Sequence, residues 1–229
     1  SQTVKKLTVI ISVIFAQLTL AAALHARELK ATITDTPVVI DGRLEETWDT
    51  ADSIAGFTQF EPNYNEPEMF GTTVKMLYDS EMLYFAFICA DPEPDKITAK
   101  KTRRDDNLPE DDGVVVFLDS FHDRNTAYFF AVNPIGTQSD GIFTDNGRTV
   151  DVEWDTSWQS ACTITTEGWI AEIGIPFSVL KFDSNVTSWG FNAERRTART
   201  RERSFWIGGL TKMFMISQFG ELSGLDLDT

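Results

Sequence analysis

The chain of 229 residues has few of the side chains that carry much of enzyme chemistry. It contains two histidines, His25 and His122, and two cysteines, Cys89 and Cys162. With so few histidines, we expect neither a histidine-based catalytic triad nor a zinc site. Two cysteines far apart in sequence do not establish a disulfide, so a bridge and a pair of free thiols both remain open.

Positive charge is also scarce. Twenty Lys and Arg residues against 35 Asp and Glu residues give a formal net charge of −15. A surface with this balance repels nucleic acid and anionic lipid, and it suits neutral or cationic partners. We therefore expect no nucleic-acid partner.

The many carboxylates do not by themselves indicate catalysis. Glycoside hydrolysis needs two carboxylates that face each other across a cleft at roughly 5–10 Å. With so many acidic residues, some pair beside the predicted strands is unavoidable, as for Asp112, Asp119 and Glu172. Glu172 is expected to pair with an arginine. We predict no catalytic residue and no enzyme, unless an appended domain supplies hydrolase activity.

Residues 1–26 are expected to lie outside the fold. Lys5 and Lys6 precede an apolar stretch at 7–24, and small residues follow near Ala26. A basic start, an apolar stretch and a small residue are typical of a cleaved secretory signal peptide. The apolar stretch is also long enough for a membrane anchor, which is the alternative. Either way we predict an exported protein of the periplasm or outer membrane.

Beyond residue 26, short strands separated by turns predict one all-β domain over 27–229. This spacing is typical of an antiparallel, jelly-roll-like β-sandwich with one or two short helical turns. Val38–Ile40 reads as a strand that stops at the Asp41-Gly42 turn, followed by a short helix that places Trp48 on an apolar face. Further strands are predicted at 72–79, 82–91, 113–119, 126–133, 158–165, 168–175, 188–196 and 203–208, with a helical turn at 176–182.

Alternation along these strands predicts the core. Residues 82–90 are apolar throughout, so that strand is expected to be buried on both faces, which leaves its inward face ambiguous. The predicted core residues are Leu83, Phe85, Phe87, Val116, Leu118, Phe129, Ala131, Trp169 and Ile173.

Seven segments, in order, resemble the carbohydrate-binding module family 9 domain. They are VVIDGRLEETWDTA (38–51), KMLYDSEMLYFAFICADPEP (75–94), DDGVVVFLD (111–119), FAVNPIG (130–136), EGWIAEIGIPFSVL (167–180), SWGFNAERR (188–196) and FGEL (219–222). The resemblance implies a β-sandwich that binds oligo- or polysaccharide without catalysis. It also implies that the helix carrying Trp48 plugs one end of the sandwich.

A narrower resemblance concerns the surroundings of this domain. The segments at 102–107, 118–140, 203–206 and 217–225 resemble the N-terminal domain of bacterial outer-membrane proteins that carry a C-terminal β-barrel domain. This implies a barrel domain as partner. Two functions then remain open: a domain that presents a glycan near the barrel, or a structural cap or plug that binds no sugar.

The family's sugar clamp is expected to be largely absent. Its sugar-binding members hold the ring between two tryptophans, and the corresponding positions here are Pro109 and Met213, with Phe214 able to supply one half. Stacking on a pyranose requires a broad flat ring. Val115 and Ala131 stand where the family has polar side chains.

The candidate sugar site therefore uses other residues. Trp206 or Trp158 would be the platform, and Asn192, Glu194 and Arg195 would contact hydroxyl or carboxylate groups. Glu194 keeps a polar group where the family has an amide.

One acidic loop is a candidate for structural calcium. RRDDNLPEDD (103–112) is rich in carboxylate oxygens, which calcium prefers. Its candidate ligands are Asp105, Asp111 and Asp112; the alternative is a solvated run of charge.

Overall fold

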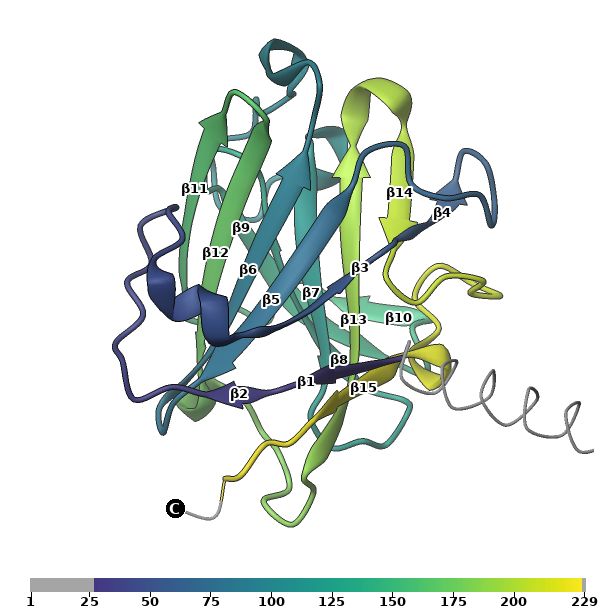
Figure 1. Cartoon of the computed structure of the whole chain (residues 1–229). Coiled ribbons are helices and arrows are strands. Elements are labelled where there is room, and N and C mark those ends of the chain that lie inside the picture. Colours follow the sequence, from purple (N-terminus) through teal and green to yellow (C-terminus); the bar gives the residue numbers. More distant parts are fainter. Residues whose placement is uncertain (1–26, 228–229) are drawn as a thin grey trace, which may run out of the picture.

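A computed structural model describes residues 27–227, which form two β-sheets packed face to face (Figure 1). The described part contains fifteen strands and only short 3-10 helices. The predicted all-β sandwich is therefore confirmed. The predicted signal peptide and its anchor alternative fall on residues 1–26, outside the described residues.

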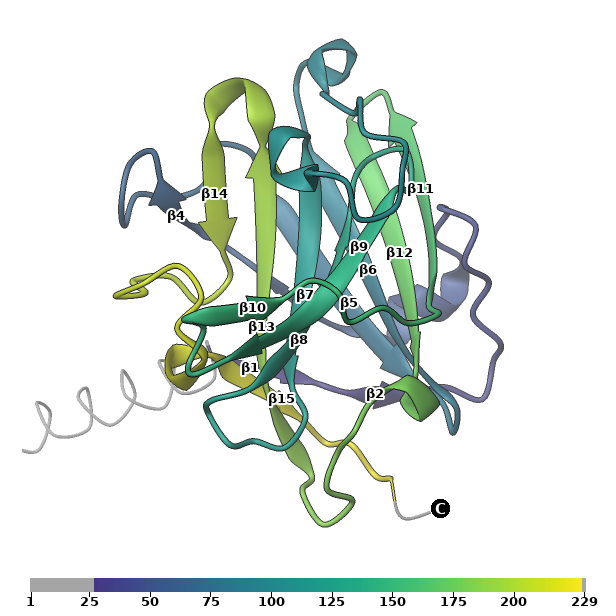
Figure 2. The same cartoon turned by 180° about the vertical axis from the view of Figure 1, so that it is seen from behind.

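The larger sheet has nine strands, and its main path runs β1-β15-β13-β7-β8-β9-β10, with β14 on β13 and β4 on β14. Its strands are β1 (Glu28–Lys30), β4 (Thr58–Glu61), β7 (Gly113–Asp119), β8 (Ala127–Val132), β9 (Gln138–Thr144), β10 (Thr149–Asp151), β13 (Ser188–Thr197), β14 (Glu202–Phe205) and β15 (Gly220–Ser223). Figure 2 views the molecule from the side of this sheet, with its strands β9 and β10 in front.

The smaller sheet has six strands in the order β11-β12-β6-β5-β2, with β3 on β5. They are β2 (Thr32–Ile33), β3 (Asp52–Ala55), β5 (Thr72–Tyr78), β6 (Met82–Ala90), β11 (Gln159–Thr165) and β12 (Gly168–Pro176). Among the described residues, only the short pairs β1 with β15 and β2 with β5 are parallel. The 3-10 helices are Glu46–Thr50, Pro94–Lys96, Leu108–Glu110, Phe177–Val179, Ala198–Thr200 and Ile216–Gln218.

The main core lies between the sheets. Phe85 of β6 stacks on Phe191 of β13, with ring centroids 5.6 Å apart. All nine residues predicted for the core are buried. The ambiguity of β6 is also resolved, because Leu83, Phe85 and Phe87 belong to the main core while Tyr84 and Ala86 belong to a second cluster.

That second cluster corrects two expectations about residues 38–51. Trp48 packs with Leu77 and Tyr84, on the outer face of the smaller sheet, so its helix covers this face instead of plugging an end of the sandwich (Figure 1). Val38–Ile40 forms no strand, because its apolar side chains serve to cover this cluster and its backbone pairs with no ladder.

Two further features of the described residues concern the cysteines and the helices. Cys89 and Cys162 are both free, and burial raises the pKa of each thiol to about 12. Within residues 27–227 no helix has the length and hydropathy that a membrane span requires.

Candidate functional site: a cavity on the outer face of the larger sheet

Alternation along β13 assigns its side chains to two faces. Because Phe191 stacks on the opposing sheet, residues 191, 193 and 195 point between the sheets. Asn192, Glu194 and Arg196 therefore point to the outer face. Glu194 lies directly opposite Val115 of β7, so Val115 shares this outer face.

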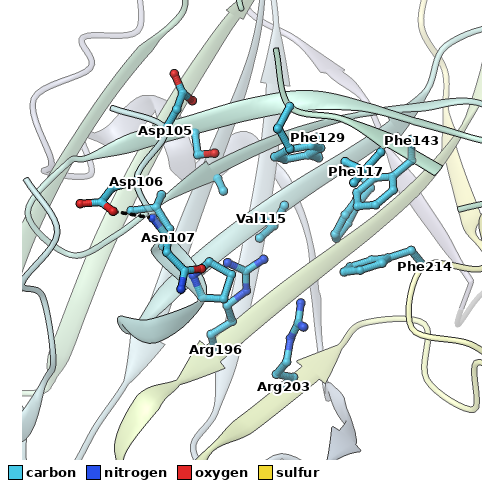
Figure 3. A pocket seen from close by; sticks show the side chains of 16 residues that line it. Asp105, Asp106, Asn107, Val115, Phe117, Phe129, Phe143, Arg196, Arg203 and Phe214 are labelled. Atoms are coloured by element: carbon cyan, nitrogen blue, oxygen red, sulfur yellow. Dashed lines mark hydrogen bonds between the residues drawn. The ribbon is translucent and has the colours of Figure 1, made fainter. Parts of the chain in front are cut away.

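A cavity of about 460 Å³ lies on this face (Figure 3). Its volume falls within the range of small-molecule sites, about 300–1,000 Å³. The lining residues are Asp105, Asp106, Asn107, Leu108, Pro109, Val115, Phe117, Phe129, Ala131, Ser139, Phe143, Val150, Val152, Arg196, Arg203 and Phe214.

Four phenylalanines form the apolar wall. Phe143 stacks on Phe214 with centroids 4.5 Å apart, and Phe117 and Phe129 contact Phe143 at 6.1 and 5.3 Å. Phe214 is only partly buried, while the other three are buried. Its ring is therefore the part of the wall that a ligand can reach most readily.

The opposite side of the cavity is charged. Glu194 accepts hydrogen bonds from Arg196 Nε at 3.0 Å and from Arg203 Nε at 2.6 Å. Burial opposes ionisation of Glu194, but the two guanidinium groups outweigh it and hold the pKa of this carboxyl below its ordinary value. Glu194 is fully buried, so it orients both arginines from beneath and is itself out of a ligand's reach.

Arg203 joins the charged side to the aromatic wall. Its guanidinium lies over the Phe214 ring, 5.4 Å from the centroid, as expected for a cation–π contact. Its Nη2 is buried and has no hydrogen-bond partner among the described residues. An unpartnered buried donor of this kind is unfavourable.

Acidic side chains at the rim already have cationic partners. Asp105 lies 3.5 Å from Arg104 Nε, and Asp106 lies 4.0 Å from Lys101 Nζ. Arg104 also pairs with Asp140 and Asp155, and Lys101 also pairs with Glu110, so the rim stays acidic. The two lining arginines supply the positive charge inside.

The two tryptophans predicted as sugar platforms lie in the core. Trp206 contacts Phe191 and Trp158 contacts Phe130, and each side chain is 7% exposed. Rings with so little exposed area offer no open face to a pyranose. The expected platform role therefore does not fit their positions. Phe214 is the ring of the cavity wall that is partly exposed, although Phe143 stacks on it and Arg203 lies over it.

The three residues predicted to contact the sugar through polar groups instead bond other parts of the protein. Asn192 is buried and bonds the backbone of Ile207. Arg195 points between the sheets, where it donates to the carbonyls of Gly71 and Ala90 at 3.1 and 2.7 Å. Glu194 does not line the cavity; it hydrogen-bonds the two arginines that do.

The positions matched to the family's sugar site do come together. Pro109, Val115, Ala131 and Phe214 all line the cavity, although they lie on four different elements: a 3-10 helix, two strands and a loop. Met213 does not line it and packs against the core instead. The cavity thus stands where the resemblance placed a sugar site, with a different set of side chains.

The residues that the sequence analysis left out of the site are Arg196, Arg203 and the buried phenylalanines. One signal was available: two-residue alternation puts Arg196, and not Arg195, on the same face as Glu194. The position of Arg203 depends on the pairing of β14 with β13, which places it opposite Arg196.

The predicted calcium ligands do not converge. Asp111 accepts hydrogen bonds from the backbone N–H groups of Lys100 and Lys101, and Asp112 accepts them from Thr98 and Ala198. These two carboxylates hold loop backbone in place. Of the three, only Asp105 belongs to a group of carboxylates that are close together.

That group is Asp105, Asp140 and Asp155, whose ligand atoms lie within 4.8 Å of one another and so are placed to hold an ion. Arg104 already lies among them. Its side chain bonds Asp140, and its Nε donates to Asp155 at 3.0 Å. The guanidinium thus supplies the positive charge that a calcium ion would bring.

The three carboxylates considered for catalysis are also engaged with backbone. Glu172 accepts from the N–H groups of Asp41 and Gly42, and Asp119 accepts from those of Asp123 and Arg124. Glu172 is therefore held by a turn and not by the arginine that we expected. None of the three lines the cavity.

The two-sheet sandwich is a fold that this chain shares with solved carbohydrate-binding modules. A family 9 module from Caldicellulosiruptor kristjanssonii, solved with cellotriose, superposes with a TM-score of 0.63 at 18% identity, covering 86% of this chain and 92% of that one. The same kind of module solved with glucose gives 0.63 at 17% identity, over 86% and 94%. At these identities the likeness shows the fold.

The chain belongs to the family of carbohydrate family 9 binding domain-like proteins, which it matches over residues 40–209. It is also similar to endo-1,4-beta-xylanase A of Thermoanaerobacterium saccharolyticum, with 27% identity over 176 residues. That match takes in 75% of this chain but only 13% of the length of the xylanase.

Proposed function

We propose that this protein is a non-catalytic carbohydrate-binding domain and that its ligand occupies the cavity on the larger sheet. The observation that carries the proposal is the arrangement of Phe214 and Arg203 in one cavity of a family 9 fold. A saccharide presents an apolar C–H face and polar hydroxyl edges. The cavity offers an aromatic wall for the first and guanidinium donors for the second.

Oligosaccharide is the ligand class that the relatives favour. The Caldicellulosiruptor modules were solved with cellotriose and with glucose, and the curated relative is a xylanase. Beyond the phenylalanine wall, Val150 and Val152 are 46% and 59% exposed and border the cavity. They extend the apolar surface past the first sugar ring, as a chain of linked sugars requires.

The test is binding of a panel of oligosaccharides to the purified protein by calorimetry, with Phe214→Ala and Phe121→Ala beside the wild type. Removing the Phe214 ring should weaken binding roughly tenfold, equivalent to about 1.4 kcal/mol of lost ring contact. Phe121 is 42% exposed and does not line the cavity, so its removal should leave affinity unchanged.

Two results would reject the proposal. One is the absence of binding to every saccharide at millimolar concentration. The other is wild-type affinity in Phe214→Ala, which would place the ligand elsewhere on the protein.

We further propose that the protein is exported to the periplasm or outer membrane and presents its glycan near a C-terminal outer-membrane β-barrel domain. The basic and apolar pattern of residues 1–26 and the narrower sequence resemblance support this. N-terminal sequencing of protein from the envelope fraction is the test, and a start at Arg27 is expected. An intact Ser1 on protein from the cytoplasmic fraction would contradict the proposal.

A further inference from the structure

We propose that the saccharide bound in the cavity is acidic and that Arg203, with Arg196, binds the carboxylate of a hexuronic acid. This inference rests on the proposed function, since it names the ligand class of the same cavity. It comes from the charge and the hydrogen-bond geometry of the cavity.

The charges inside the cavity do not balance. Two guanidinium groups, from Arg196 and Arg203, share the single carboxylate of Glu194. Glu194 is 0% exposed and accepts hydrogen bonds from Nε of both arginines and from Nη2 of Arg196, all beneath the cavity. The two guanidinium groups together with Glu194 therefore carry a net positive charge, on the side that faces the cavity.

The other acidic groups nearby lie outside the cavity or at its rim. Glu61 is opposite Arg203 in the strand pair and helps to raise the pKa of Arg203, but it does not line the cavity. Asp105 and Asp106 lie at the rim, where they contact Arg104 and Lys101. An anion on the ligand would place a counter-charge inside the cavity.

Geometry favours a carboxylate over a hydroxyl. The Arg203 side chain is 19% exposed and lines the cavity, and a guanidinium edge presents parallel N–H groups that match the two oxygens of a carboxylate. Its Nη2 is buried without a partner among the described residues, so a carboxylate reaches that nitrogen only if the side chain turns toward the cavity. Its Cζ lies over the Phe214 ring, 5.4 Å from the centroid. A sugar ring on the phenylalanine wall would then hold its C6 carboxylate toward Arg203 (Figure 3).

The test compares sugars that differ only in the oxidation of C6. The β-1,4-linked trimers of glucuronate and mannuronate are titrated into the protein beside their neutral counterparts, cellotriose and mannotriose. At low salt at least one acidic trimer should bind roughly tenfold more tightly than its neutral counterpart, as expected for an added charge-assisted pair. Raising the salt to about 0.5 M should reduce this preference and leave neutral binding unchanged.

Variants then assign the preference to one side chain. Arg203→Gln should remove the difference in affinity between acidic and neutral trimers, and it should also weaken neutral binding because the same guanidinium donates to hydroxyl groups. Arg203→Lys, which keeps the charge without the planar fork, should retain only part of the preference. The control is Arg148→Gln, whose side chain is 63% exposed and lies outside the cavity, and which should keep the full preference. The melting temperature of each variant is recorded, and the salt series on the wild type serves if Arg203→Gln does not fold.

The outcomes separate this inference from the proposed function. If neutral trimers bind as tightly as the acidic ones, or if the preference survives in Arg203→Gln, the acidic-sugar inference is wrong and carbohydrate binding stands. If neither acidic nor neutral trimers bind, and no other saccharide of the panel does, both are wrong.

Discussion

The indole of Trp48 donates a hydrogen bond from Nε1 to Oε1 of Glu172, at 3.0 Å, on the outer face of the smaller sheet. The other oxygen of Glu172 accepts the backbone N–H of Gly42 at 2.7 Å. One buried carboxylate thus ties the Asp-Gly turn and the short helix after it to strand β12. This explains why a turn, an acidic helix and a tryptophan follow one another so closely in the sequence.

Replacing Trp48 by Phe should destabilise the protein by about 1–3 kcal/mol, because Glu172 keeps its burial but loses a donor. Chemical denaturation gives the free energy of unfolding. The control is Trp154→Phe, where the indole is partly buried against Tyr128 with centroids 5.0 Å apart. A Trp48→Phe variant as stable as wild type would show that the hydrogen bond contributes nothing.

The turn at Gly42 allows a second comparison. Gly42 and Gly56 have left-handed φ values of +84° and +77°, but an added Cβ would meet Thr163 Oγ1 at 2.6 Å only at Gly42. Gly56→Ala should cost about 1 kcal/mol for its backbone conformation alone. Gly42→Ala should cost more, because Thr163 and its strand must also shift. Equal losses in thermal unfolding would refute the steric part of this explanation.

The stability of the charged side of the cavity should depend on pH. Because the folded-state pKa of Glu194 lies below its ordinary value of 4.5, its contribution to stability is fully present above about pH 4.5 and is lost as the pH falls through the lower, folded-state pKa. Glu194→Gln should therefore cost about 3–5 kcal/mol at pH 7, by leaving two buried cations without a partner, and less at pH 3.

The measurement is the difference in unfolding free energy between Glu194→Gln and wild type at both pH values. Glu167→Gln, which changes an exposed glutamate at a hairpin turn, should differ little from wild type at either pH. A difference for Glu194→Gln that stays constant, or widens on acidification, would contradict the assigned direction of the pKa.

The acidic group at Asp105, Asp140 and Asp155 yields a metal prediction. Because Arg104 supplies the counter-charge, millimolar calcium should raise the melting temperature of the wild type little. Arg104→Gln removes this cation, so calcium should then raise the melting temperature by several degrees more than in wild type. Scanning calorimetry with calcium and with a chelator checks this. A large calcium effect on the wild type that Arg104→Gln does not increase would rule the explanation out.

Much of the fold could be read from the chain because its strands are short and regular. The predicted strand at 113–119 is the observed β7, and the hairpin of β5 and β6 differs from its prediction by one residue at two ends. Strand β9 was missed, since Gln138–Thr144 contains polar residues and a glycine, and its pairing with β8 makes it a strand. For Val38–Ile40 the error is the reverse: a strand was predicted and none forms. Its β-branched side chains pack over the smaller sheet, which gives the same local sequence pattern as a strand.

The sequence by itself determined the all-β class, the family and the residues of the core, because these follow from local alternation and from ordered motifs. Only the tertiary structure decided the site. Trp158 and Trp206 look like surface platforms in a sequence, since composition cannot distinguish a buried ring from an exposed one. The cavity depends on Arg203 and Phe214 meeting across a loop and a strand pair, which is set by long-range packing and by no local pattern.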